Sequence, residues 1–212
     1  MSFTNELGKQ VLILDGAMGT MVQNLGLTDA AFGGPEFKML TDLLVFSRPD
    51  DLEGIHLEYL QAGANLIETD TFGASPLRLK EFDFSKFDSS DLKAIPESLD
   101  LKTCSLESLT LQLNIEGCRI VQRAVEKYRT QPDYDGRPLF VAGSIGPSNY
   151  VVSSTEANLN KGTFDQIVEN FYHQVLGLIE GGADVLLIET QQDILETKAI
   201  IEGANKAFAE KK

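Results

Sequence analysis

The sequence has no tryptophan, only two cysteines and two histidines, and few basic side chains. Its 18 lysines and arginines are outnumbered by 32 aspartates and glutamates, which gives a net charge of -14. A protein of this charge repels nucleic acid and anionic lipid, so neither is an expected partner. The spacing of Cys104 and Cys118 matches neither a disulfide framework nor a standard zinc knuckle.

Long hydrophobic runs are also absent. The longest aliphatic stretches, such as residues 11–14 and 185–188, are far too short to span a bilayer, and the N-terminus has no apolar core of signal-peptide length. We therefore expect a cytoplasmic protein without membrane contact. With 42% hydrophobic and 24% charged residues, the 212-residue chain has the composition of one globular domain.

Short β-like runs alternate with longer helical patterns four times, which is typical of βαβ units that form a parallel sheet. Each run is rich in Val, Ile or Leu, as a strand buried on both faces should be. The four predicted strands are residues 11–15, 65–71, 139–144 and 184–190.

The helical patterns carry their own start and stop signals. Ser47, followed by Pro49 and Asp50, predicts a helix capped by Ser47. Thr163 with Gln166 predicts a second cap of the same kind, and that helix is expected to end at the glycine pair 181–182.

Residues 82–105 are rich in Asp, Ser and Lys and show no clear period, so we interpret them as a surface insertion. The four βα units on either side of it fit two architectures. They can form a complete open sheet or the first half of an eightfold barrel.

A polar residue stands where each hydrophobic strand stops, and parallel α/β folds bind ligands at the carboxyl ends of their strands. Period-two alternation places Asp15 and Glu189 on one face of their own strands, so both carboxylates can converge on a common mouth. Such a pair suits a ligand with an ammonium group, because a cation offsets the cost of burying carboxylates. The other strand-end candidates are Glu68, Asp70 and Ser144.

Asp15 is followed by a glycine-containing turn at residues 16–20, GAMGT. Its glycines allow close approach of the backbone to a ligand and can turn amide N–H groups toward a carboxylate. The alternative is a tight βα turn with no ligand, which is also the simpler interpretation of residues 143–147, GSIGP. If both strand-end features act together, the sequence predicts a site for a zwitterion such as an amino acid.

Five strings, in this order, resemble the homocysteine S-methyltransferase family, and within it the N-terminal module of the cobalamin-dependent methionine synthase branch. The similarity runs from about residue 11 to residue 208. The strings are LILDGAMGTM at 12–21, DLLVFSRPD at 42–50, GANLIETDTF at 63–72, GSIGP at 143–147 and GGADVLLIET at 181–190.

The resemblance implies a (β/α)8 TIM barrel of which residues 1–212 form the first four βα units. It also implies transfer of a methyl group from methylcobalamin, itself charged from 5-methyltetrahydrofolate, to homocysteine, giving methionine. Asp15 and Gly16 match the family's first-strand homocysteine contacts, and Glu189 matches the acid that holds the substrate amino group. Weaker candidates are Ala17, Glu68, Ser144 and Asp70, the last of which departs from the asparagine that is common in the family.

Zinc and cobalamin are the cofactors that the resemblance implies, with cobalamin and folate domains as partners in an intact protein. The family's zinc ligands lie in Gly-x-Asn-Cys and Gly-Gly-Cys-Cys-Gly strings, and neither string is present. Cys104 and Cys118 are not at strand ends, and His56 and His173 are expected to be mid-helix. We therefore predict no metal ligand or catalytic residue here, and expect an inactive fragment of a methyltransferase.

Two alternatives stay open. The chain can be a noncatalytic half-barrel that pairs with a copy of itself or with another chain, or a homocysteine methyltransferase that uses betaine or S-methylmethionine as methyl donor.

Overall fold

The computed structural model describes residues 2–154 and 159–211. The strands are β1 (Leu66–Glu68), β2 (Phe140–Ile145) and β3 (Val185–Ile188). The α-helices are α1 (Phe3–Glu6), α2 (Met18–Asn24), α3 (Leu44–Ser47), α4 (Pro49–Ala62), α5 (Pro76–Leu79), α6 (Leu106–Arg129), α7 (Phe164–Gly181) and α8 (Ile194–Glu210). Five short 3₁₀ helices are η1 (Asp29–Phe32), η2 (Pro35–Phe37), η3 (Thr41–Leu43), η4 (Phe84–Lys86) and η5 (Ser89–Asp91).

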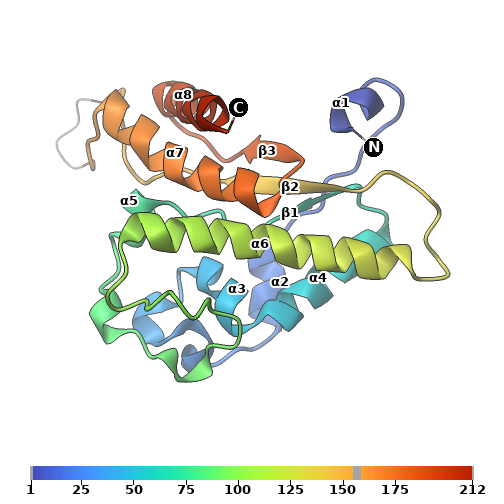
Figure 1. The fold of residues 1–212 in the computed structure, drawn as a ribbon, viewed down its shortest axis with the longest axis horizontal. Coiled ribbons are helices and arrows are strands. Elements are labelled where there is room, and N and C mark those ends of the chain that lie inside the picture. Colours follow the sequence, from blue (N-terminus) through green and yellow to red (C-terminus); the bar gives the residue numbers. More distant parts are fainter. Residues whose placement is uncertain (1, 155–158, 212) are drawn as a thin grey trace.

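The sheet is parallel and its strands follow chain order, β1-β2-β3 (Figure 1). Three of the four predicted strands are therefore confirmed; β1 and β3 are shorter than expected, and β2 is shifted by one residue. The fold is an α/β arrangement of the kind that a partial barrel would have.

The first predicted strand, residues 11–15, was wrong as a full strand. It forms a single parallel bridge, Leu14 to Leu66, beside β1. The Asn65 side chain accepts a hydrogen bond from the Ile13 N–H at 3.0 Å, where a strand would use a backbone carbonyl. Val11 is 86% exposed, so little apolar burial holds the start of this segment in an extended ladder.

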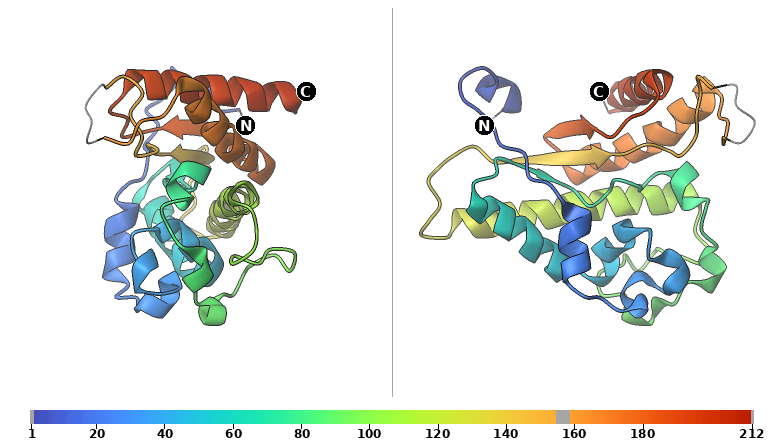
Figure 2. Two further views of the ribbon diagram at one scale, coloured as in Figure 1. Left: turned by 90° about the vertical axis from the view of Figure 1, so that its left-hand side faces the viewer. Right: turned by 180° about the vertical axis from the view of Figure 1, so that it is seen from behind.

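The long helices cover one face of the sheet in chain order. Helix α4 packs on α6, α6 on α7, and α7 on α8 (Figures 1 and 2). The main core lies between these helices and the outward side chains of the strands, such as Ile67, Val141 and Ile145. On the inner face, Phe3 of α1 packs edge-on against Phe140 with ring centroids 5.4 Å apart.

A second core lies beneath α6 and is built from the segment of η1 to α3 together with the predicted insertion. Phe37 of η2 packs against Phe84 and Phe87 of the insertion, with centroids 5.4 and 5.2 Å away. Leu99 and Leu101 are buried in the same cluster. Residues 82–105 are thus more than a surface loop, because their apolar side chains complete a core.

The predicted helix caps had different outcomes. Thr163 and Gln166 form the expected capping box of α7, and Gly182 takes the left-handed conformation at its end, so both signals are confirmed. Ser47 was wrong as the cap of α4, because Arg48 occupies that position. The Ser47 hydroxyl instead donates to the Ala31 carbonyl at 2.5 Å and joins η1 to α3.

The aliphatic side chains at both edges of the sheet are half-buried or exposed. All four residues of β3 are half-buried, and Ile13 beside β1 is 54% exposed. Helix α8 displays Ile194, Ile201 and Phe208 at intervals of seven residues, all exposed. Within residues 2–154 and 159–211, no further strand pairs with β3. None of the helices described there has the length and apolarity needed to cross a membrane.

Candidate functional site at the carboxyl ends of the strands

Four of the predicted site residues meet at the carboxyl ends of the strands. The register pairs Glu68 with Ala142 and Ser144 with Leu187, so these positions share the inner face of the sheet. Asp15 follows the Leu14 bridge, and Glu189 directly follows β3. The parallel arrangement therefore gathers their side chains at one edge.

Hydrogen bonds fix two of the carboxylates. Asp15 Oδ1 accepts from the Glu68 N–H at 2.9 Å, which ties the first segment to β1. The buried Ser144 hydroxyl donates to Glu189 Oε1 at 2.6 Å, which ties β2 to the end of β3. Each carboxylate is therefore oriented by the neighbouring strand.

The three acids of this cluster, Asp15, Glu68 and Glu189, are close enough to affect one another. Burial raises the pKa of Asp15 to about 7, and the negative charge of Glu189 adds to this effect. Burial likewise raises the pKa of Glu68 to about 7, with contributions from Glu189 and Asp15. A cation placed among them would favour their charged forms and lower both pKa values.

The turn after Asp15 leads into α2. Ala17 takes a left-handed conformation, with φ 49°, and occupies the N-cap position of α2. A Cβ atom built on Gly16 would meet no atom within 4 Å, so the space beside it is open. The start of the turn thus borders the strand-end cluster with open space beside it, whereas Met18 at the start of α2 packs against the second core.

Asp70 lies apart from the cluster, although it is only two residues beyond Glu68. Its side chain is buried and accepts a hydrogen bond from the Thr41 hydroxyl at 3.4 Å. The neighbouring charge that affects Asp70 most is that of Asp42, not that of Asp15 or Glu189. The structure thus brings four of the five strand-end candidates together, and it places Asp70 beside Thr41 instead.

Sequence reasoning missed the polar residues that support the site from behind. Gln174 of α7 is fully buried and donates from Nε2 to the Thr71 carbonyl at 2.8 Å. The Thr71 hydroxyl donates to the Ser144 carbonyl at 3.0 Å, which links α7 to the strand that carries Ser144. A glutamine three residues after Phe171, within the apolar stripe of a helix, was the signal that could have revealed this support.

The family model for homocysteine S-methyltransferases matches residues 12–212. The chain belongs to the homocysteine S-methyltransferase family. The match includes every strand and every residue of the strand-end cluster.

Solved structures of the homocysteine methyltransferase MmuM from Escherichia coli share the fold of this family member. The metallated form aligns with a TM-score of 0.68 at 24% identity, covering 97% of this chain and 62% of MmuM. The oxidized form gives a TM-score of 0.68 at 24% identity, with 96% and 61% coverage. The apo form gives 0.58 at 23%, with 94% and 57% coverage. This chain thus spans about three fifths of the length of MmuM.

The residues that the structure describes in this family member do not fit a zinc site. Across residues 2–154 and 159–211, no three His, Cys, Asp or Glu side chains form a group that could hold a metal ion. Cys118 is buried in α6 and its thiol lies against the Leu178 carbonyl, and burial raises the pKa of this thiol to about 12. His56 is buried in α4, and burial lowers its pKa to about 3.

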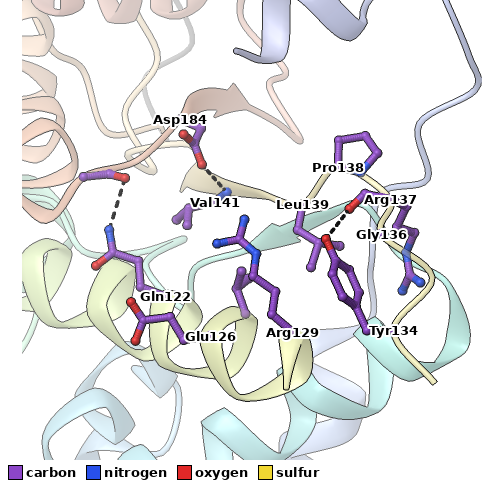
Figure 3. Close-up of a pocket in the computed structure, with 12 residues that line it drawn as sticks. Gln122, Glu126, Arg129, Tyr134, Gly136, Arg137, Pro138, Leu139, Val141 and Asp184 are labelled. Atoms are coloured by element: carbon purple, nitrogen blue, oxygen red, sulfur yellow. Dashed lines mark hydrogen bonds between the residues drawn. The ribbon is translucent and has the colours of Figure 1, made fainter. Parts of the chain in front are cut away.

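A cavity of about 290 Å³ lies at the opposite end of the sheet (Figure 3). Its lining includes Arg129 of α6, Leu139 just before β2 and Asp184 just before β3. The Asp184 carboxylate accepts from the Val141 N–H at 2.9 Å. Because ligands of parallel α/β folds bind at the carboxyl ends of strands, this cavity does not compete with the strand-end cluster.

Proposed function

We propose that this chain binds the amino-acid end of homocysteine at the strand-end cluster, as part of a homocysteine S-methyltransferase. The observation that carries the proposal is the convergence of Asp15, Glu68 and Glu189 with no basic side chain bonded to any of them among the described residues. An ammonium group supplies the missing positive charge. Family membership selects homocysteine among the amino acids that carry such a group.

Each residue has a separate part in this proposal. Glu189, held by Ser144, accepts hydrogen bonds from the substrate amino group, and Asp15 and Glu68 complete its negative surroundings. Gly16 and Ala17 leave their backbone open to the substrate carboxylate. The thiol end of homocysteine then points away from the bound ammonium, toward the part of the mouth that these residues leave open.

The methyl donor is the finer part of the proposal. The strings at residues 42–50 and 69–74 resemble the cobalamin branch, so we propose methylcobalamin, with cobalamin and folate domains as partners in the intact protein. S-methylmethionine and betaine stay as alternative donors, since the similarity to MmuM, a homocysteine methyltransferase, does not select among the three. Titration of the complete protein with methylcobalamin, S-methylmethionine and betaine in separate assays distinguishes the three.

Calorimetric titration of homocysteine into the 212-residue chain tests the binding site. Removing one charged hydrogen-bond partner costs roughly 1.5–3 kcal/mol, so Glu189→Gln should weaken homocysteine binding by about tenfold or more. Glu202→Gln changes an exposed acid on α8 and serves as the matched control. Unchanged affinity in both Glu189→Gln and Asp15→Asn would remove the cluster from the site.

A second candidate function, a noncatalytic binding or assembly module, is favoured by the exposed apolar edges of the sheet. Exposed sheet edges invite pairing with another chain. Val11 is 86% and Ile194 is 72% exposed, and they lie on segments that border opposite edges. Sedimentation of the purified chain separates the two candidates: a stable self-dimer that binds no homocysteine supports the module, whereas homocysteine binding by a monomer supports the methyltransferase part.

A methyltransferase part of this kind should be inactive by itself, since no group of metal ligands that could activate the thiol is found among residues 2–154 and 159–211. Elemental analysis of the purified chain tests that expectation. Stoichiometric zinc would contradict it and would reassign Cys104 or Cys118.

A further inference from the structure

Two buried acids, Asp42 of η3 and Asp70 after β1, face each other outside the strand-end cluster. Their exposed fractions are 3% and 4%. Asp42 Oδ1 accepts from the Gly73 N–H at 2.8 Å, and Thr41 donates to Asp70 Oδ1. Asp70 Oδ2 is buried and has no hydrogen-bond partner among the described residues. A buried carboxylate oxygen without a donor is costly, which requires an explanation.

The charges around the pair do not neutralise it. Arg78 of α5 is the cation that influences Asp42, but its guanidinium is bonded to Glu81 and to the Met39 carbonyl. Helix α6 packs against η3 and contributes apolar side chains, such as Leu109, to the same core. The two acids therefore have one cation nearby, and its guanidinium is already bonded to other groups.

The loop of residues 70–73 packs closely against η3 and α5 at Gly73. A Cβ atom built on Gly73 would lie 3.0 Å from Asp42 Oδ2 and 3.3 Å from Arg78 Cγ. The loop of residues 70–73 is thus held between η3 and α5. Phe72 of this loop is half exposed, and its carbonyl accepts from the Gly146 N–H at 3.0 Å beside the end of β2.

We propose that Asp42 and Asp70 form a proton switch, in which a proton on Asp70 keeps the 70–73 loop packed on η3 and its release to solvent drives the loop and η3 apart. With the proton bound, the pair carries one negative charge, on Asp42, which the Gly73 N–H stabilises. Without it, two negative charges share a site that excludes water. Like charges in such a site repel strongly, and the arrangement opens to let solvent in.

The electrostatics of the two acids agree with this geometry. Burial raises the pKa of Asp42 to about 6, and burial together with the charge of Asp42 raises the pKa of Asp70 to about 8. Between these values Asp42 is charged and Asp70 is neutral. A carboxyl whose pKa is raised in the folded state stabilises the fold at low pH and loses that contribution as the pH rises through the folded pKa.

Urea unfolding of the wild-type chain and of Asp70→Asn, measured from pH 6 to pH 8, tests the switch. Each proton retained only by the folded state makes the unfolding equilibrium constant rise by a further factor of about ten per pH unit, and Asp15 and Glu68 contribute to this rise beside Asp70. Asp70→Asn has nearly the same shape and no proton to lose, so its slope should be lower than that of the wild type by about tenfold per pH unit, and the part due to Asp15 and Glu68 should remain. Asp133→Asn, an exposed loop acid, should keep the wild-type rise.

Hydrogen exchange of the Gly73 amide shows where the opening occurs. After correction for the intrinsic pH dependence, its protection should fall as the pH rises past 8 in the wild type and stay constant in Asp70→Asn. An unchanged pH slope in Asp70→Asn would overturn the proposal. It would also be overturned if added Na⁺ or Mg²⁺ abolished the difference in slope between the wild type and Asp70→Asn, because a bound cation would then neutralise the pair.

Discussion

The chain holds two groups of acids with raised pKa values that differ in their access to solvent. The strand-end cluster is half-buried and borders open space at the mouth of the sheet. The Asp42–Asp70 pair is almost fully buried. Burial is the largest cause of the shift in both. A raised pKa therefore marks a carboxylate whose negative charge no nearby cation neutralises. Exposure to solvent then decides whether a bound ligand or a bound proton neutralises that charge.

The largest expected difference between the two groups is in the free energy of unfolding that is lost when one acid of each group is replaced by alanine. At pH 5, Asp42→Ala leaves the buried Gly73 N–H without an acceptor, and we expect a loss of about 3 kcal/mol in the free energy of unfolding. Asp15→Ala leaves the Glu68 N–H nearer to water, so about 1 kcal/mol is expected. Denaturant unfolding measures both. Equal losses would show that the two sites are equally accessible to solvent.

We expect the second largest effect in the pH dependence of homocysteine binding, which should depend on the strand-end cluster and not on the Asp42–Asp70 pair. Asp15 and Glu68 have pKa values of about 7, and an ammonium group binds their charged forms. If one proton must leave, the affinity falls by about tenfold for each pH unit below 7. Calorimetry in two buffers of different ionisation enthalpy counts the protons released.

The matched control for that measurement is Asp70→Asn, which should leave the affinity at pH 7 unchanged. An affinity that does not vary from pH 6 to pH 8 would exclude Asp15 and Glu68 as the titrating groups. A large effect of Asp70→Asn would instead show that the two groups are coupled through the 70–73 loop.

Salt should produce the smallest difference. Screening acts on partly exposed charges and hardly on buried ones, so raising NaCl from low to physiological strength should weaken homocysteine binding by roughly threefold. The pH slope that depends on Asp70 should not change. A salt-sensitive slope would indicate that solvent reaches the buried pair in the folded state.

Much of the sheet could be predicted from the sequence, because β2 and β3 are aliphatic runs and α7 carries a capping box. The first segment was harder. Val11, Ile13 and Leu14 have the composition of a central strand, yet they lie at an edge where one bridge forms. Composition reports β propensity, whereas a strand also needs regular backbone pairing with its neighbour, and here the Asn65 side chain replaces a backbone acceptor.

The site was predictable in part, since a polar residue after an aliphatic strand gave Asp15, Ser144 and Glu189. Whether Asp70 joined them could not be read from the sequence. It follows Glu68 by two residues, and strand alternation would have placed both on one face, but β1 ends at Glu68. The chain then turns, and Asp70 contacts Thr41, a residue far away in the sequence.

One amide side chain gives the sheet a fixed point that its backbone alone lacks. Asn65 accepts from Ile13 on one side and donates to the Pro138 carbonyl, 2.9 Å away, on the other. A slide of either neighbouring segment by one residue would leave the corresponding end of this amide without its partner. The three segments are thereby aligned before their strands begin, so the order in which the polar strand ends meet is set at the far end of the sheet, by a residue that never contacts them.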